Sequence, residues 1–255
     1  MQTDASGANR SQCPFVFVNM AMTADGKIAT ANRAVSSFSS RQDHEHLLEL
    51  RSTADAVMAG ARTVDLNPVN LGPGSARFRR LRLKLGLGEY NLRIIVSGSG
   101  SINLDAEIFK HKFSPVIILT TRRTKRPQLE KLETLADEIK AFGSREIEFS
   151  RALNWLRGKW GVKRLLCEGG GELNDALFRA GLVNELHLTV CPKILGGRDA
   201  PTIADGVGFR HLSRAASLKL KSARRRGDEM FLVYEVARAT TRQIGNPRSE
   251  ETAEH

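Results

Sequence analysis

RLLCEGGGELNDALFRAG, at residues 164–181, contains the clearest structural pattern in this chain of 255 residues. Its first four residues, Arg164–Cys167, end in an apolar run typical of a buried strand, and residues 172–180 resemble a helix that Gly181 ends. Glu168 and three glycines separate the two elements. Backbone without side chains can approach an anion there, and the free amides of the helix N-terminus point toward it. The stretch therefore predicts a strand, a phosphate cradle and a helix in succession.

A second turn of small residues follows another apolar run, at residues 56–59, and leads from Gly60 into a possible helix with the hydroxyl of Thr63 available. Turns at the carboxyl ends of strands in one open α/β sheet line a common crevice, which is where such sheets bind ligands. The glycine triplet comes late in the chain and lacks the G-x-G-x-x-G spacing, which disfavours an ordinary Rossmann dehydrogenase but not a nucleotide ligand. The alternative interpretation is that both turns serve only close packing or capping.

The rest of the chain alternates strand and helix patterns and then ends in alternating strands. Strands are expected at 15–20, 56–59, 93–97, Val116–Thr120, Arg164–Cys167, 185–190, 217–225 and 230–236, with a hairpin turn at 226–228. Helices are expected from the cap Ser40, with Asp43 three residues on, to about Arg51, at 127–140, at 151–160 after the cap Ser150, and at 172–180. The pattern predicts an α/β fold with a mostly parallel sheet, an antiparallel C-terminal hairpin and helices on both faces. We expect one domain at 13–238 between flexible tails at 1–12 and 239–255.

Composition narrows the classes of function. Without a membrane-spanning apolar run or a signal pattern, the chain is expected to be cytoplasmic and not to bind membrane. The three cysteines have no metal-ligand spacing, so we expect no metal site and buried thiols. The net charge of +11 is concentrated at 77–84, 122–126 and 224–226, which we interpret as loops or strand ends that suit phosphate-bearing ligands. Because only 6% of residues are aromatic, a base-stacking nucleic-acid surface is not expected.

Charged residues near the first strand complete the candidate site. Asp25 and Lys27 follow that strand in a turn, and Glu168 ends a central one. Together they would supply hydrogen-bond donors and an acid/base group beside the predicted cradle. Each charge taken alone is more often part of the solvated surface.

Several ordered motifs resemble the pyrimidine reductases of riboflavin synthesis. They are TADGKIAT at 23–30, LR at 50–51 followed by ADAVMAGART at 54–63, CEGGGEL at 167–173, GLVNELHLTVCPKILGG at 181–197 and DAPTIADGVGF at 199–209. The similarity runs over most of residues 14–236. No zinc-deaminase motif is present in this sequence, which is similar to the single-domain diaminoribosylaminopyrimidinone-phosphate reductases in that respect.

The resemblance implies a dihydrofolate-reductase-like fold, a homodimer, and NADPH-driven reduction of a ribosylaminopyrimidine phosphate to its ribitylamino form. It assigns catalysis to Lys27 and Glu168. Substrate contacts would come from Asp25, Lys27, Ser39, Arg51 and Glu168. Cofactor contacts would come from Ala21, Gly60, Thr63, Asn67, Ser97, Gly169, Gly170, Gly171, Glu172 and Leu173.

One segment departs from the family pattern. The stretch 63–71 lacks the family's Leu-Thr-x-Arg-like substrate contact and is followed by a basic insertion at 72–90. We hypothesise that an arginine within 77–82 anchors the substrate phosphate instead, and that Arg122 and Arg123 recognise the 2′-phosphate of NADPH. The departure keeps open another pteridine or pyrimidine reductase of the same fold. A nucleic-acid-binding protein built on an inactive reductase fold is the alternative from a different class.

Overall fold

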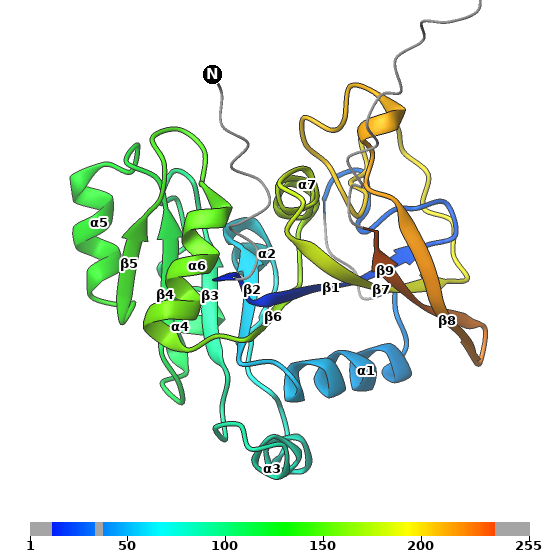
Figure 1. The fold of residues 1–255 in the computed structure, drawn as a ribbon, viewed down its shortest axis with the longest axis horizontal. Helices are drawn as coiled ribbons and strands as arrows, with labels where there is room; N and C mark the ends of the chain where they lie inside the picture. The colour runs from blue at the N-terminus through cyan, green and yellow to red at the C-terminus, as the bar shows by residue number, and fades with distance from the viewer. Residues whose placement is uncertain (1–11, 34–37, 238–255) are drawn as a thin grey trace, which may run out of the picture.

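The computed structural model describes residues 12–33 and 38–237, and a single sheet organises them (Figure 1). Its strands are β1 (Phe15–Thr23), β2 (Ala56–Gly60), β3 (Leu92–Val96), β4 (Val116–Thr120), β5 (Glu138–Ala141), β6 (Arg164–Cys167), β7 (Val183–Cys191), β8 (Leu218–Arg226) and β9 (Glu229–Val236). Within the described ranges the sheet has nine strands in the order β5-β4-β3-β2-β6-β1-β7-β9-β8. Neighbours from β5 to β7 are parallel, and β9 is antiparallel to both β7 and β8. The predicted parallel sheet with an antiparallel C-terminal hairpin is confirmed.

Helices cover both faces of the sheet, as predicted. They are α1 (Arg41–Ser52), α2 (Ala61–Leu66), α3 (Ala76–Lys84), α4 (Glu107–Lys110), α5 (Arg126–Glu133), α6 (Phe149–Trp160) and α7 (Gly171–Arg179), with a 3-10 turn at Leu212–Arg214. Strand residues alternate between two cores: Val18 belongs to the core that contains residues of α6 and α7, whereas Phe17 belongs to the core that contains residues of α1, α2, α4 and α5. Figure 1 shows α7 and α1 on opposite sides of β1 and β7.

The predicted cap of α1 is confirmed, with one difference in its partner. The hydroxyl oxygen of Ser40 accepts hydrogen bonds from the amides of Gln42 and Asp43. The amide of Ser40 in turn donates to the carboxylate of Glu229, at 2.8 Å, and not to Asp43. A carboxylate on the C-terminal hairpin therefore completes the cap, which ties α1 to β9.

The helix predicted at 127–140 is wrong in its second half. The helix α5 ends at Glu133, and residues Glu138–Ala141 form the edge strand β5, in which Ile139 pairs with Ile118 of β4. Residues 129–140 alternate leucines, isoleucine and charges in a way that suits either element. The free edge of β4 favours a strand, so tertiary pairing overrides local propensity there.

Two further expectations need correction. The basic stretch 77–84 is not a loop but most of the helix α3, whose Phe78 is buried. The helix α6 begins at Phe149 with Glu148 at its cap position, so Ser150 lies inside it. The short helix α4 was not expected at all. The predicted tails fall outside the described residues apart from Gln12.

The thiols are buried at two of the three positions. Cys167 and Cys191 have no exposure, and burial raises the pKa of each thiol to about 12, so both stay protonated at neutral pH. Cys13 is half-buried, which corrects the expectation for that residue. In the described part of the chain, no cluster of side chains suits a metal ion, and no helix has the length and apolar character needed to cross a membrane.

Candidate functional site

The two predicted turns meet at the carboxyl edge of the sheet. Because β2 and β6 are neighbours, Gly60 at the end of β2 lies beside the triplet that follows β6, and its amide donates to the carbonyl oxygen of Gly169 at 2.8 Å. A Cβ placed on Gly170 would lie 3.5 Å from the hydroxyl oxygen of Thr63. The structure thus brings the two turns together at one edge of the sheet.

Each of these turns starts a helix whose N-terminus is free of side-chain caps. Gly170 caps α7 and Gly60 caps α2, and neither has a side chain to occupy the first amides. Free amides and the helix dipole make such ends suitable for phosphate, and here two of them lie side by side. The arrangement fits the pyrophosphate of a dinucleotide.

The three consecutive glycines have different structural reasons. Gly169 has a φ of +78°, and a Cβ there would lie 2.7 Å from the sulfur of Met20. A Cβ on Gly171 would lie 2.7 Å from the carbonyl oxygen of Thr202. Close packing therefore explains Gly169 and Gly171. A Cβ on Gly170 would make only an ordinary contact with the hydroxyl oxygen of Thr63, so close packing does not explain this glycine.

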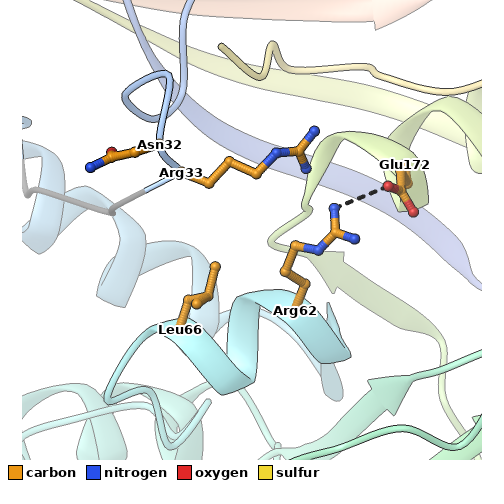
Figure 2. A pocket seen from close by; sticks show the side chains of 5 residues that line it. All are labelled: Asn32, Arg33, Arg62, Leu66 and Glu172. Carbon is orange, nitrogen blue, oxygen red and sulfur yellow. Dashed lines mark hydrogen bonds and ion pairs between the residues drawn. The ribbon is translucent and has the colours of Figure 1, made fainter. Parts of the chain in front are cut away.

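A cavity of about 450 Å³ lies between α2, the first turn of α7 and residues 32–33 (Figure 2). Figure 2 shows the side chains of Arg33 and Arg62 directed toward Glu172 in the first turn of α7. The guanidinium of Arg62 forms an ion pair with Glu172 at 3.1 Å, and both side chains are exposed. Asn32 and Leu66 complete the lining. Of this lining the resemblance assigned only Glu172 to the site.

A buried ion pair lies next to the glycine turn. Nε and Nη2 of Arg51 donate to the two carboxylate oxygens of Glu168, each at 2.6 Å, and the side chains are only 8% and 9% exposed. A third donor, Nη1, bonds the carbonyl oxygen of Gly72 at 2.9 Å. Such bidentate pairs fix both position and orientation. Arg51 therefore holds the Glu168 carboxylate in one geometry at the end of β6.

Lys27 reaches the same region through a different segment. Its ammonium donates to the carbonyl oxygen of Ala200 at 3.0 Å, and its backbone forms an antiparallel bridge with Thr202. Thr202 in turn packs against Gly171, and Asn174 of α7 donates to the carbonyl oxygen of Ile203. The segment 199–206 thus links the Lys27 turn to the start of α7. No hydrogen bond joins Lys27 to Glu168 directly, as far as the chain is described.

Asp25 lies in a hydrogen-bond network that joins its own turn to the segment after β7. Its carboxylate accepts from the hydroxyl of Thr23 at 2.5 Å and from the amides of Gly196 and Leu195 at 2.7 and 3.2 Å. The bond from Thr23, followed by that from Gly196, lowers the pKa of Asp25 from 3.8 to about 2. These partners occupy the carboxylate, so Asp25 orients the Lys27 turn.

We expect Asp25→Asn to reduce the melting temperature at about pH 6 and to leave it unchanged near pH 2. Because the carboxyl pKa is lower in the folded state, the ionised Asp25 stabilises the fold above pH 3.8. This contribution is lost as the pH falls toward about 2. Thermal unfolding across this range measures the effect. The exposed Asp105→Asn is the control. An equal loss of stability at both pH values would contradict the assignment.

The remaining predicted site residues are divided between the crevice and other places. Ala21 lies beyond the last pair of β1 with β6, and Ser97 directly follows β3, with its hydroxyl donating to the carbonyl oxygen of Ser101. Asn67 ends α2 by donating to the carbonyl oxygen of Thr63 at 2.7 Å. The side chain of Leu173 is buried in the core, which leaves its amide for a ligand.

Ser39 lines a second cavity, of about 350 Å³, together with the N-terminus of α1 and the turn of the C-terminal hairpin. The first cavity has a different lining, which includes Glu172 among the predicted site residues. The structure therefore places Ser39 and Glu172 at different cavities.

The hypothesised phosphate anchor at 77–82 is wrong in its location. Figure 1 shows α3 beyond α1, away from the starts of α2 and α7. Arg82 is 1% exposed and donates only to carbonyl oxygens. Arg122 and Arg123, by contrast, are exposed just after the carboxyl end of β4, so their proposed role stays a prediction.

Sequence reasoning missed several residues that shape the site. Asn32, Arg33 and Leu66 line the cavity, and Asn174 holds the segment 199–206. The motif at 199–209 was the available signal for that segment. For Arg33 the local sequence holds no signal, because only the fold brings it opposite α7.

Comparison with known proteins identifies the family of the chain. The family model of the RibD C-terminal domain matches residues 14–232. Two proteins named 2,5-diamino-6-ribosylamino-4(3H)-pyrimidinone 5′-phosphate reductase are similar to the chain. The one from Aquifex aeolicus is 30% identical over 228 residues (88% of this chain, 96% of that protein). The one from Archaeoglobus fulgidus is 34% identical over 196 residues (77% and 88%).

Solved structures share the fold. A pyrimidine reductase-like protein from Corynebacterium diphtheriae has a TM-score of 0.73 at 22% identity, covering 88% of this chain and 92% of that one. RibD from Acinetobacter baumannii has a TM-score of 0.69 at 19% identity, and the match covers 89% of this chain but 59% of that protein. The matched model spans most of the described chain, and the chain belongs to the family of RibD C-terminal domains.

Proposed function

We propose that the chain is an NADPH-dependent reductase that converts a ribosylaminopyrimidine 5′-phosphate to the ribitylamino form. The observation that carries the proposal is the meeting of two uncapped helix N-termini, through Gly60 and Gly169, beside the buried Arg51–Glu168 pair. The first feature suits a dinucleotide and the second suits a polar, reacting sugar. The similar proteins of Aquifex aeolicus and Archaeoglobus fulgidus are named as reductases of a ribosylaminopyrimidinone 5′-phosphate.

The crevice fits NADPH by the chemistry of its donors. The first amides after Gly170 and Gly60 have no side-chain cap, and Thr63 adds a hydroxyl close to Gly170. These groups would hold the pyrophosphate, with Ala21 and Ser97 flanking it at neighbouring strand ends. Bound NADPH supplies hydride, and the protein supplies position and charge.

Glu168 and Lys27 would act on the sugar. A carboxylate fixed by Arg51 can accept hydrogen bonds from the hydroxyls of the opened ribose and hold its anomeric carbon in one place. The ammonium of Lys27 would give or share a proton at the ring oxygen as the ring opens. Arg51 has most of its donors occupied, so we assign it a positioning role more than a direct substrate contact.

The decisive assay follows NADPH absorbance with the ribosylaminopyrimidine phosphate and its deaminated counterpart offered separately. We expect oxidation of NADPH with at least one of them, and the preferred substrate identifies the branch. Absence of turnover with both would contradict the proposal. Turnover with a pteridine alone would favour another reductase of the same fold, and salt-sensitive polynucleotide binding without NADPH oxidation would favour the nucleic-acid alternative.

Removing both Arg122 and Arg123 is expected to raise the KM for NADPH by about tenfold and to leave the KM for NADH unchanged. The expected change corresponds to one lost charge-assisted hydrogen bond to the 2′-phosphate, about 1.5 kcal/mol. Steady-state kinetics with the two cofactors measures it. Arg126→Ala, which removes an arginine 88% exposed at the start of α5, is the control. Equal changes with NADPH and NADH would reject the role.

By resemblance we also propose a homodimer. Light scattering coupled to size-exclusion chromatography gives the mass directly, and twice the chain mass of 28.1 kDa is expected. A mass of one chain at micromolar concentration would contradict this proposal.

A further inference from the structure

Arg82 of α3 is a buried arginine whose hydrogen bonds all go to backbone. Only 1% of it is exposed. Its Nη1 donates to the carbonyl oxygens of Arg51 and Ala54, at 2.9 and 2.5 Å, and its Nε donates to that of Gly88 at 2.9 Å. Burying a guanidinium is unfavourable unless its donors are satisfied. Arg82 meets this condition by clamping the C-terminal end of α1 at Arg51.

The beginning of the same segment contacts Arg51 a second time. The carbonyl oxygen of Gly72 accepts from Nη1 of Arg51 at 2.9 Å. That carbonyl is itself held, because the amide of Gly72 donates to the side chain of Asn70 and the side chain of Asn91 donates to the carbonyl oxygen of Leu71. We call residues 71–91 the α3 segment. This segment contacts the backbone carbonyl of Arg51 through Arg82 and its guanidinium through Gly72.

Packing leaves Gly72 little freedom to move. A Cβ on Gly72 would lie 2.5 Å from the ring of Phe113, which stacks on Tyr90 with ring centroids 4.9 Å apart. The guanidinium of Arg93 also lies over the Phe113 ring, 4.4 Å from its centroid. The carbonyl that meets Arg51 is thus part of a close-packed wall, and its direction is set before any ligand binds.

We propose that the α3 segment is a positioning element for Glu168, acting through Arg51. Arg82 fixes the Arg51 backbone, Gly72 fixes its guanidinium, and the remaining donors of Arg51 hold both oxygens of the Glu168 carboxylate. The inference rests on the proposed function, since it gives the carboxylate a role in hydride transfer to the sugar. The basic insertion at 72–90, which interrupts the family pattern, would then position Glu168 and would not bind the substrate phosphate.

The alternative is that Arg82 only fastens α3 to α1. Fastening alone predicts a lower melting temperature with an unchanged rate in each folded molecule. Positioning predicts a lower rate in folded molecules that still bind NADPH normally, because the proposed cofactor contacts are at Gly170 and Thr63 and not at Arg51. The two interpretations therefore differ in kcat per cofactor-binding site.

The test compares Arg82→Met with Arg82→Lys and with Arg80→Met, which removes an exposed arginine of the same helix. Active sites are counted by NADPH titration at a temperature where every variant is folded. We expect Arg82→Met to lower kcat per site by about 10- to 100-fold, with the KM for NADPH within about twofold of the wild type. Arg82→Lys is expected to recover part of the loss, and Arg80→Met to behave as the wild type.

Two further measurements separate the outcomes. If Arg82 acts through Arg51, adding Arg82→Met to Arg51→Lys lowers kcat little more than Arg51→Lys alone, whereas independent effects multiply. Carbodiimide labelling followed by mass spectrometry reports the exposure of the Glu168 carboxylate without turnover, and we expect faster labelling in Arg82→Met only. The inference would be overturned by an unchanged kcat and labelling rate in Arg82→Met, or by effects of Arg82→Met and Arg51→Lys on kcat that multiply in the double variant. Either result would leave the proposed function standing. A wild-type protein without turnover would overturn the proposed function, and the inference with it.

Discussion

Replacing Glu168 by glutamine is expected to lower kcat by about a hundredfold or more while the Kd for NADPH changes by less than about threefold. Glutamine keeps the shape and one acceptor oxygen but removes the negative charge that faces Arg51. The sugar then loses a fixed anionic acceptor, whereas the pyrophosphate contacts at the two glycine turns stay intact. Steady-state kinetics and fluorescence titration with NADPH measure the two quantities separately.

The same substitution is expected to destabilise the fold, which has to be separated from catalysis. Arg51 becomes a buried charge without a carboxylate, and breaking such a pair costs about 3–5 kcal/mol. Adding Arg51→Met removes the uncompensated charge, so the double variant should regain stability and remain inactive. Glu130→Gln, an exposed carboxylate on α5, is the control. Full activity in a folded Glu168→Gln protein would remove Glu168 from the mechanism.

Alanine at Gly170 is expected to raise the KM for NADPH by about tenfold or more without lowering the melting temperature. Gly170 has a φ of −70°, which any residue tolerates, and its Cβ would meet only Thr63, at 3.5 Å. The methyl group would fill the gap between the two helix N-termini and displace a phosphate from their amides. The loss of one or two charge-assisted bonds corresponds to about 1.5–3 kcal/mol or more.

The neighbouring glycines supply the matched comparison. Alanine at Gly169 or at Gly171 puts a Cβ 2.7 Å from its neighbour, the Met20 sulfur or the Thr202 carbonyl oxygen, so both variants should melt at lower temperature. Differential scanning fluorimetry and NADPH titration on the three variants give the pattern. Similar destabilisation in all three, with unchanged cofactor affinity in the folded fraction, would show that the triplet serves packing alone.

Local patterns were sufficient for most of the fold. Apolar runs such as Val116–Thr120 and the cap at Ser40 specify their own elements, because burial and capping depend on residues close together in the chain. The glycine turns after β2 and β6 could be placed at one edge because parallel strands present their carboxyl ends together. Local pattern failed at Glu138–Ala141, where the helix and strand patterns were equally good.

Long-range partners were beyond the reach of the sequence alone. The pairing of Arg51 with Glu168, the burial of Arg82 against backbone carbonyls and the binding of Asp25 to the amide of Gly196 all depend on segments far apart in the chain. The sequence does not distinguish a solvated charged residue from one that is buried and paired, because its environment depends on the elements that pack beside it. Chain-local chemistry thus determined most of the strands and the two glycine turns, and tertiary packing alone decided which charges are buried together and what each of them holds.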